Sequence, residues 1–407
     1  MVYLQKYAQI DNRHRNTLSL CLNTMTKFKL IALLLFCSAT SIMAQLVPFR
    51  VNNLWGYSNA KGDIIIPATF EFTDFFQDSL GFVMKDSVFY AISTKGDILS
   101  GPYTHYGNFG SGLCPVQEKN GKSYYINQHG KKTIDMGFSA TENFSEGLAV
   151  VSIKKKLGII NAKGQWIRQP DFDTSSAFYK SGFLLAISKG KYFYINHQGQ
   201  TLNLPDTVLP GGIFSEGLAP VYVVKPYNSD GAKMPTTYLE FIDSTGKVVL
   251  NNFINNGFDY SEYIRLEKEF RDGKAIIKTR NELGWDYFFL DKKGRFSPLY
   301  STTRHLGDSL FLGAIGYYMS DIRIVDSNYY VAGQFQQKPT QVGEFGNGLL
   351  PFRDKEGNWG YVNSNCQLKI PAKYSAAFPF KNGFAFVIFN GHQGVIDTTG
   401  REYFIDK

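Results

Sequence analysis

The sequence predicts an all-β protein built as a tandem array of about ten three-stranded units, each of roughly 35 residues. An apolar position recurs at nearly constant spacing, and each unit carries the same tight turn, opened by Asn, Asp or Ser. A fixed period in this range is typical of solenoids, propellers and related arrays, in which each unit buries its apolar face against its neighbours. We favour an open superhelical array, because the first and last units both look complete. Many propellers instead close by splitting one unit between the termini, so a propeller-like ring is the alternative.

The unit boundaries follow from the residue that precedes the first strand of each unit. Successive members of this series are 36, 31, 35, 35, 35, 56, 36, 39 and 35 residues apart. The ten positions are Leu46, Phe82, Leu113, Leu148, Phe183, Leu218, Lys274, Leu310, Leu349 and Phe384. Ten such units are enough to form a continuous core.

Each unit is expected to fold as a short meander. In the last copy, a strand at residues 385–389 turns at Asn390-Gly391 and returns at residues 394–397. In the first copy the third strand ends at Pro67, because proline cannot donate to a strand ladder.

The turn between the second and third strands is the most regular signal. Asn, Asp and Ser cap their own backbone at the first position of a type I turn, and Gly is favoured three residues later, where φ is often positive. The turns open at Asn59, Ser93, Asn127, Asn161, Asn196, Asp243, Asp291, Asp326, Asn363 and Asp397. Two copies have Tyr329 and Cys366 in place of Gly, each after an Asn (Asn328, Asn365). Because Asn tolerates positive φ well, we expect these two hairpins to be shifted by one residue.

Several copies share longer motifs. Residues 359–374 read W-G-Y-V-N-S-N-C-Q-L-K-I-P-A-K-Y, residues 144–150 read F-S-E-G-L-A-V, and residues 214–221 read F-S-E-G-L-A-P-V. These stretches resemble the WG-repeat family, also called KWG repeats, whose pattern is roughly W-G-Y-I-N-x-x-G-x-x-V-I-P-x-x-Y followed by F-S-E-G-L-A-x-V. The resemblance covers nearly all of residues 45–407, although the Trp-Gly pair itself occurs only at residues 55–56 and 359–360. The family is defined by its repeat and has no catalytic motif, so the resemblance implies no catalytic residues.

Residues 25–44 have the pattern of a secretory signal peptide: Lys27 and Lys29 precede an apolar run, and small residues follow. We expect cleavage after Ala44. Residues 1–24 are then expected to be an over-extended reading frame, the alternative being an unusually long charged region of the signal. The mature protein is expected to be exported, periplasmic or extracellular, with no further segment long enough to span a membrane.

Charge and cysteine content limit the choice of partners. The protein carries a formal net charge of +8. Residues 1–44 contribute five Lys or Arg and one Asp, so residues 45–407 carry only +4, which does not suggest nucleic acid as a partner. Nothing in the spacing of Cys114 and Cys366 requires a disulfide, although an exported array that closed into a ring could bring them together.

Two insertions, at residues 225–237 and 251–271, interrupt the regular spacing. The first enlarges a hairpin tip, and residues 261–270 of the second are expected to form one or two turns of helix. Insertions in repeat proteins map to loops on one face, often the binding face, while the alternative is drift in a surface loop. The candidate interaction residues are Tyr227, Tyr238, Tyr260, Tyr263 and Arg265.

No residue pattern indicates catalysis, a metal site or a cofactor. The histidines are scattered over separate units, with no His-x-x-x-His or Cys-x-x-Cys spacing, no Gly-x-Ser-x-Gly elbow and no phosphate-binding loop. Carboxylates such as Asp171 and Asp173 could in principle serve a glycosidase, because its two carboxylates meet in space and not in sequence. We therefore expect a protein without enzyme activity and without a bound metal or cofactor.

The expected function is that of an exported, non-enzymatic scaffold that binds protein partners in the cell envelope. The alternative is a cell-wall or surface carbohydrate-binding protein, which an aromatic content of 15% would suit. Most aromatic residues fall at repeated core positions, however, so core packing explains them better.

Overall fold

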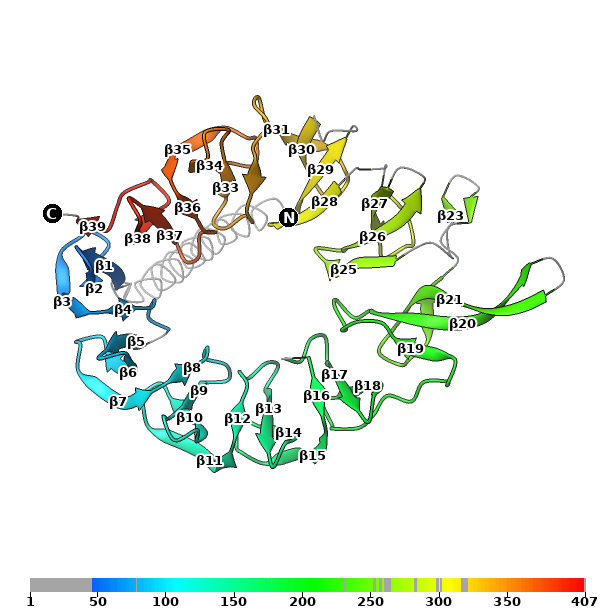
Figure 1. Ribbon diagram of the computed structural model, residues 1–407, viewed down its shortest axis with the longest axis horizontal. Helices are drawn as coiled ribbons and strands as arrows, with labels where there is room; N and C mark the ends of the chain where they lie inside the picture. The colour runs from blue at the N-terminus through cyan, green and yellow to red at the C-terminus, as the bar shows by residue number, and fades with distance from the viewer. Residues whose placement is uncertain are drawn as a thin grey trace, which may run out of the picture. The chain divides into compact units, whose positions relative to one another are not determined.

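The computed structural model describes residues 46–405, apart from residues 78, 177, 230–231, 252–253, 256–257, 260–264, 282–283, 298–299, 301 and 316–320. Its regular elements in these residues are all β-strands. They form ten small antiparallel meanders and one additional two-stranded hairpin (Figure 1). The predicted all-β repeat architecture is therefore confirmed.

Apart from β39, the strands of the first five sheets come from the N-terminal half of the protein. Sheet 1 contains β39 (Phe404–Ile405), β1 (Val47–Val51), β2 (Leu54–Ser58) and β3 (Ile64–Phe70); sheet 2 contains β4 (Phe72–Thr73), β5 (Leu80–Lys85), β6 (Val88–Ser93) and β7 (Ile98–Tyr103). Sheet 3 contains β8 (His105–Tyr106), β9 (Leu113–Gln117), β10 (Ser123–Asn127) and β11 (Lys132–Phe138); sheet 4 contains β12 (Ala140–Thr141), β13 (Leu148–Ile153), β14 (Lys156–Asn161) and β15 (Trp166–Phe172). Sheet 5 contains β16 (Thr174–Ser175), β17 (Phe183–Ser188) and β18 (Lys191–Asn196).

The other five sheets follow the same plan. Sheet 6 contains β19 (Val208–Pro210), β20 (Ala219–Ser229), β21 (Ala232–Ile242) and β22 (Val248–Leu250); sheet 7 contains β25 (Arg265–Arg271), β26 (Lys274–Asn281) and β27 (Gly284–Asp291). Sheet 8 contains β28 (Thr302–Gly307), β29 (Leu310–Ile315), β30 (Asp321–Val325) and β31 (Val331–Gln334); sheet 9 contains β32 (Gln341–Val342), β33 (Leu350–Arg353), β34 (Trp359–Val362) and β35 (Leu368–Tyr374). Sheet 10 contains β36 (Ala376–Ala377), β37 (Phe384–Phe389) and β38 (His392–Asp397), and the extra hairpin is β23 (Ile254–Asn255) with β24 (Phe258–Asp259).

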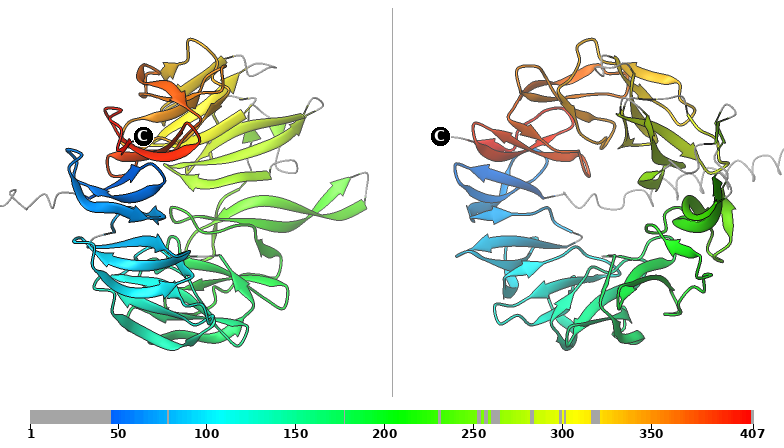
Figure 2. Two further views of the ribbon diagram at one scale, coloured as in Figure 1. Left: turned by 60° about the vertical axis from the view of Figure 1, so that its left-hand side comes forward. Right: turned by 45° about the vertical axis from the view of Figure 1, so that its right-hand side comes forward.

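The ten sheets close into a propeller-like ring. A separate buried apolar cluster lies between each sheet and the next, from sheets 1 and 2 through sheets 9 and 10. A tenth cluster joins Val47, Phe49 and Trp55 of sheet 1 to Phe384 and Val395 of sheet 10. Figure 2 shows the first and last sheets side by side in both views.

The preference for an open array was therefore wrong, and the alternative ring is the arrangement found. The C-terminal strand β39 pairs with β1 in parallel, with Arg50 opposite Phe404 and Val51 opposite Ile405. Sheet 1 thus takes one of its two edge strands from the other end of the protein. The sequence gives little sign of this closure because β39 contains only two residues.

One predicted unit boundary is also wrong. The boundary residue of the second unit is Leu80, where β5 begins, and not Phe82, because Leu80 bridges to Gln77 as Leu148 bridges to Ser145 in sheet 4. With Leu80 as the second position, the first three intervals become 34, 33 and 35 residues, so the period is more regular than the sequence suggested.

The Asn/Asp/Ser turn forms as predicted. In sheet 1, Asn59 Oδ1 accepts hydrogen bonds from the backbone N–H groups of Lys61 and Asp63, and Gly62 has a φ of 85°. The predicted shift in two copies is wrong: Tyr329 and Cys366 themselves take the position of Gly, with φ angles of 67° and 59°.

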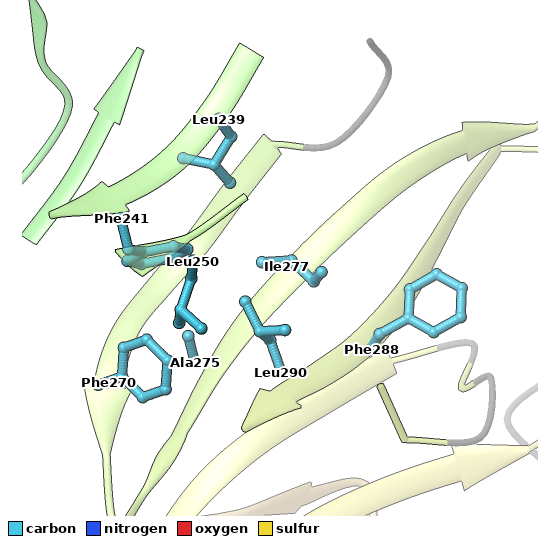
Figure 3. Packing of buried hydrophobic residues seen from close by; sticks show 8 residues of the cluster. All are labelled: Leu239, Phe241, Leu250, Phe270, Ala275, Ile277, Phe288 and Leu290. Carbon is cyan, nitrogen blue, oxygen red and sulfur yellow. The ribbon is translucent and has the colours of Figure 1, made fainter. Parts of the chain in front are cut away.

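The first insertion enlarges a hairpin as expected, whereas the second differs from the expectation. Residues 225–237 extend β20 and β21 as a paired hairpin, with Val224 opposite Thr237 and Ser229 opposite Ala232. Residues 265–271 form strand β25, so the helix expected over residues 261–270 is wrong at least from residue 265 onward. Figure 3 shows the reason: Phe270 packs into the core between sheets 6 and 7, beside Phe241 and Leu250, and burial of its side chain fixes this segment as part of a sheet.

Buried tyrosines connect neighbouring sheets. The hydroxyls of Tyr57, Tyr125 and Tyr361 donate to the backbone carbonyls of Asp74, Glu142 and Phe378, each in the following sheet, at 2.7, 2.7 and 2.9 Å. The tyrosine of the W-G-Y motif therefore does two things: it fills the core and it satisfies a carbonyl of the next unit.

Replacing Tyr361 with phenylalanine is expected to lower the free energy of unfolding by about 1 kcal/mol, because the carbonyl of Phe378 loses its donor while the core volume is kept. Urea denaturation of the purified protein measures this. Tyr330→Phe is the matched control, because Tyr330 is 73% exposed and its replacement is expected to leave stability unchanged. Equal stability of the Tyr361 variant and the parent would contradict the assigned hydrogen bond.

Candidate ligand-binding cavity

The F-S-E-G motif residues hold adjacent sheets together. Ser145 Oγ donates to the carbonyl of Tyr179 at 2.8 Å, and the Glu146 carboxylate accepts from the N–H groups of Ser181 and Gly182 at 2.8 and 2.9 Å. The second copy repeats both contacts between sheets 6 and 7: Ser215 donates to the carbonyl of Phe270, and Glu216 accepts from Gly273 N–H at 3.0 Å. These polar side chains therefore form hydrogen bonds between adjacent sheets of the ring.

The predicted interaction residues lie on two different sheets. Tyr227 lies on β20, and the half-buried Tyr238 lies on β21, where Lys225 Nζ is 5.6 Å from its ring centroid. Arg265 is exposed and begins β25 of sheet 7. Tyr260 and Tyr263 fall outside the described residues.

A cavity of about 460 Å³ lies between the inner strands of sheets 7 and 8, and its lining on β25 begins at Glu267, two residues after Arg265. We call it the β25–β28 cavity, because residues 267–271 of β25 and residues 303–305 of β28 supply most of its lining. Figure 1 shows both strands on the inner side of the ring, with β7, β11 and β15 on its outer side. Two smaller cavities of about 230 and 260 Å³ lie elsewhere on the ring.

Two polar side chains of β28 set this cavity apart. His305 is 6% exposed, and neither of its ring nitrogens has a hydrogen-bond partner among the described residues. The Oγ1 atom of Thr303 is also buried without a partner in this part of the structure. Because alternate residues of a strand point to the same face, Thr303 and His305 line the cavity together. Leaving such groups unpaired costs about 1–3 kcal/mol each, so a ligand that pairs with them gains that free energy.

The side chain of His305 is held neutral. Burial is the main cause that lowers its pKa to about 4, and the nearby cation of Arg271 contributes in the same direction. Lys268 and Lys180 also lower the pKa, while Glu216 opposes them. A neutral imidazole has one N–H donor and one acceptor nitrogen, so His305 can both give and receive a hydrogen bond.

The depressed pKa of His305 is expected to make the protein sensitive to acid. An unfolded histidine has a pKa near 6.5, so the unfolded state binds this proton first as the pH falls. The stabilisation is complete above pH 6.5 and is lost between pH 6.5 and 4, by about 3 kcal/mol in total. Urea denaturation at pH 7 and pH 5 should show a smaller loss for His305→Phe than for the parent protein. An unchanged loss would show that His305 carries a normal pKa.

Ion pairs satisfy only part of the charge around the cavity. Arg271 Nη1 lies 3.3 Å from Glu344 Oε2, and Glu267 Oε2 lies 2.7 Å from Lys278 Nζ. Arg304 donates through Nη1 to the carbonyl of Val342 at 2.6 Å. Within the described part of the protein, the amines of Lys180 and Lys268 have no ion pair or hydrogen bond.

Sequence reasoning missed Thr303 and His305 as site residues. His305 counted only as one of several scattered histidines, and nothing in its neighbourhood resembles a known motif. One signal was available in the sequence: in this unit no F-x-x-G turn precedes Leu310. In the structure, strand β28 occupies residues 302–307 at this place. A departure from the repeat therefore marks the site.

Other candidate features do not form a site. Cys114 and Cys366 are both free, and burial raises their thiol pKa values to about 12 and about 11. In the residues that the structure describes, no group of three His, Cys, Asp or Glu side chains is placed to hold a metal ion. The described residues also contain no helix long and apolar enough to cross a membrane.

Comparison with solved structures supports the fold. A structure described as a eukaryotic initiation factor aligns with 88% of this protein and 95% of its own length, at 11% identity and a TM-score of 0.50. BamB from Moraxella catarrhalis aligns with 73% of this protein and 94% of its own length, at 10% identity and a TM-score of 0.35. Dipeptidyl peptidase 4 from Porphyromonas gingivalis aligns with 81% of this protein and 58% of its own length, at 8% identity and a TM-score of 0.42. The first likeness concerns the fold alone, and the other two are too distant to support any conclusion.

Sequence comparison identifies the repeat. No curated protein matches the sequence. Residues 55–88, 125–156, 158–192 and 359–391 match the family described as WG containing repeat. The match at residues 55–88 starts in β2 of sheet 1 and ends in β6 of sheet 2, so one sequence repeat spans two structural sheets. Four segments of this protein therefore match the WG containing repeat, and they form parts of sheets 1 to 5, 9 and 10 of the propeller-like ring.

Proposed function

We propose that this protein is an exported, non-enzymatic scaffold that binds a polypeptide partner at the β25–β28 cavity. The observation that carries the proposal is a pair of side chains that line a cavity of about 460 Å³, Thr303 and His305, whose buried polar atoms have no hydrogen-bond partner among the described residues. A cavity of this size admits one or two side chains of a partner, whose polar groups can pair with both residues. The second insertion supports the same position, because its residues 251–264 lead directly into β25.

The repeat itself supports a binding role over a catalytic one. The recurring polar residues of the F-S-E-G and turn motifs are occupied by contacts that hold the ring together. A rigid ring with one distinctive inner cavity suits the presentation of a docking site on a fixed frame.

Affinity capture tests the proposal. The protein from Gln45 to Lys407 is immobilised and exposed to an envelope extract, alongside the double variant Thr303→Val, His305→Phe and a second variant with residues 251–264 replaced by a short turn. Residues 265–271 stay in place because β25 belongs to sheet 7. The control is Lys154→Ala, Lys155→Ala, at a hairpin tip of sheet 4 between β13 and β14.

The expected result is one saturable protein partner, retained by the control and lost with the double variant. Turnover of an envelope polymer by the purified protein would contradict a non-enzymatic role. Mass spectrometry of the protein made from the full reading frame tests export, because a mature N-terminus at Gln45 is expected.

Carbohydrate binding is the second candidate. Neutral His305 and Thr303 can each donate and accept hydrogen bonds, a combination that suits sugar hydroxyls, and Tyr287 also lines the cavity. Retention on peptidoglycan or surface polysaccharide, reduced by the same double variant and with no protein partner captured, would favour this function over the scaffold.

A further inference from the structure

The charge balance of the β25–β28 cavity leaves positive charge uncompensated. Arg271 is neutralised by Glu344, whereas in the described structure Lys180 and Lys268 have no carboxylate partner and Arg304 bonds only to a carbonyl oxygen. Among the carboxylates that line the cavity, Glu267 is used by Lys278, and Glu269 is the one described carboxylate that has no partner. Three cations thus face one free carboxylate, and the cavity carries a net positive charge.

The hydrogen-bonding groups at the cavity wall fit the same sign of charge. Thr303 supplies an O–H donor through its buried Oγ1 atom, and neutral His305, whose side chain is buried, supplies one N–H donor. Donors that are fixed in a water-poor site stabilise a negatively charged acceptor more strongly than donors in water do. A carboxylate has two oxygens and can accept from both residues at once.

We propose that the β25–β28 cavity binds a carboxylate group of a polypeptide, either an Asp or Glu side chain or the C-terminal carboxylate. Thr303 and His305 donate to its oxygens, and Lys180, Lys268 and Arg304 supply the attracting charge. This assignment rests on the proposed scaffold function and specifies the chemistry of its partner.

The short strand segments around the cavity favour a polypeptide as the source of the carboxylate. Among the described strands, β25 and β28 are the edge strands of sheets 7 and 8. The carbonyls of Phe270 and Leu306 accept from Ser215 Oγ and Phe345 N–H, and the other inner-edge groups of these strands have no neighbouring strand in the described structure. An extended peptide can pair with such an edge while one of its side chains enters the adjacent cavity.

Peptide titration followed by NMR tests the proposal. The protein from Gln45 to Lys407, with its histidine rings isotope-labelled, is titrated with three probes: acetyl-Ala-Ala-Glu-Ala-Ala-amide, the same peptide with Gln for Glu, and the Gln peptide with a free C-terminal carboxylate. His305 is assigned from the signal that is absent in His305→Phe.

Both carboxylate peptides, or one of them, should bind at least tenfold more tightly than the neutral Gln peptide and shift the His305 signal. The stronger of the two identifies the source as a side chain or a peptide terminus. Thr303→Val and His305→Phe should each weaken binding at least fivefold. Lys268→Gln, at an exposed site, should also weaken binding of the carboxylate peptides and reduce the salt dependence of that binding. The control variant Lys154→Ala, Lys155→Ala should bind these peptides as the parent protein does. Circular dichroism establishes that each variant is folded.

Two outcomes overturn the proposal. Equal binding of the Glu and Gln peptides would show that charge does not govern recognition, and unchanged binding by both the Thr303 and His305 variants would place the carboxylate elsewhere. If capture of a partner still depends on the cavity under either outcome, the scaffold function stands and the carboxylate assignment alone fails. If no partner is captured while the peptides discriminate as expected, the carboxylate site stands and the scaffold function fails.

Discussion

Replacing Tyr403 with alanine is expected to lower the free energy of unfolding by about 3–5 kcal/mol, as removal of a fully buried aromatic ring does in other cores. Tyr403 is 1% exposed and packs against Phe384, with ring centroids 5.5 Å apart. Its hydroxyl donates to the carbonyl of Ala60 at 2.8 Å, and its own carbonyl accepts from Arg50 N–H at 3.2 Å. The residue therefore joins the last part of the protein to the first sheet.

Thermal and urea unfolding measure this loss, and Tyr403→Phe separates its causes. The phenylalanine variant keeps the ring and loses only the hydroxyl contacts, so a cost of about 1 kcal/mol is expected. If Tyr403→Ala were as stable as the parent, the closed ring would not contribute to stability in solution.

Replacing Gly56 with alanine is expected to cost about 3 kcal/mol, because a Cβ atom at this position would lie 2.3 Å from the carbonyl oxygen of Ile66 and 2.6 Å from the carbonyl carbon of Pro67. These are backbone atoms of β3, which crosses close to β2 at a register shift. The clash cannot be relieved by rotating a side chain. Gly360, in the other Trp-Gly pair, meets the carbonyl of Ile370 at 2.6 Å in the same way.

Gly147→Ala is the matched control for the Gly56 variant. Gly147 has a φ of 83° and open space around the added Cβ atom, so its replacement tests backbone conformation without a clash, at a cost of about 1–2 kcal/mol. A Gly56 variant no less stable than the Gly147 variant would show that β3 can move away from β2.

The sequence was sufficient to predict the units because each one carries its own local signals. The Asn59-type turn and the buried tyrosine after Trp-Gly act within one unit or between adjacent units, and the structure places both as the period suggested. Closure of the ring depends on a contact between Arg50 and Phe404, and a two-residue strand has no pattern of its own. Local periodicity therefore predicts the repeat and does not distinguish an array from a ring.

The position of the positive φ angle in the turn at Tyr329 was predicted wrongly, again because it depends on a contact with another sheet. The Asn before Tyr329 suggested a shifted turn, but Tyr329 itself adopts the left-handed conformation. Two contacts of its ring favour this: the ring stacks on Phe289 with 6.0 Å between centroids, and the Lys274 amine lies 4.6 Å from the ring centroid. These partners belong to the previous sheet. At this position, side-chain packing determined the backbone conformation more strongly than turn propensity did.

The candidate site was located only coarsely from the sequence. The second insertion pointed to the region of Arg265, and β25 does border the cavity, but the side chains that distinguish it are Thr303 and His305, on the next sheet. Their importance depends on burial without a hydrogen-bond partner among the described residues. That property arises from the tertiary structure, and the only sign in the sequence is the missing F-x-x-G turn before Leu310.

The pairing of β39 with β1 also affects the order in which the molecule can be made. A ribosome releases Val47, Phe49 and Trp55 more than 300 residues before their partners in sheet 10 and β39. Until then, one apolar side of the first sheet has no neighbour, and exposed apolar surface of this kind promotes aggregation and recruits chaperones. Premature termination before Phe384 would thus leave most of the polypeptide made while this apolar side of the first sheet stays uncovered.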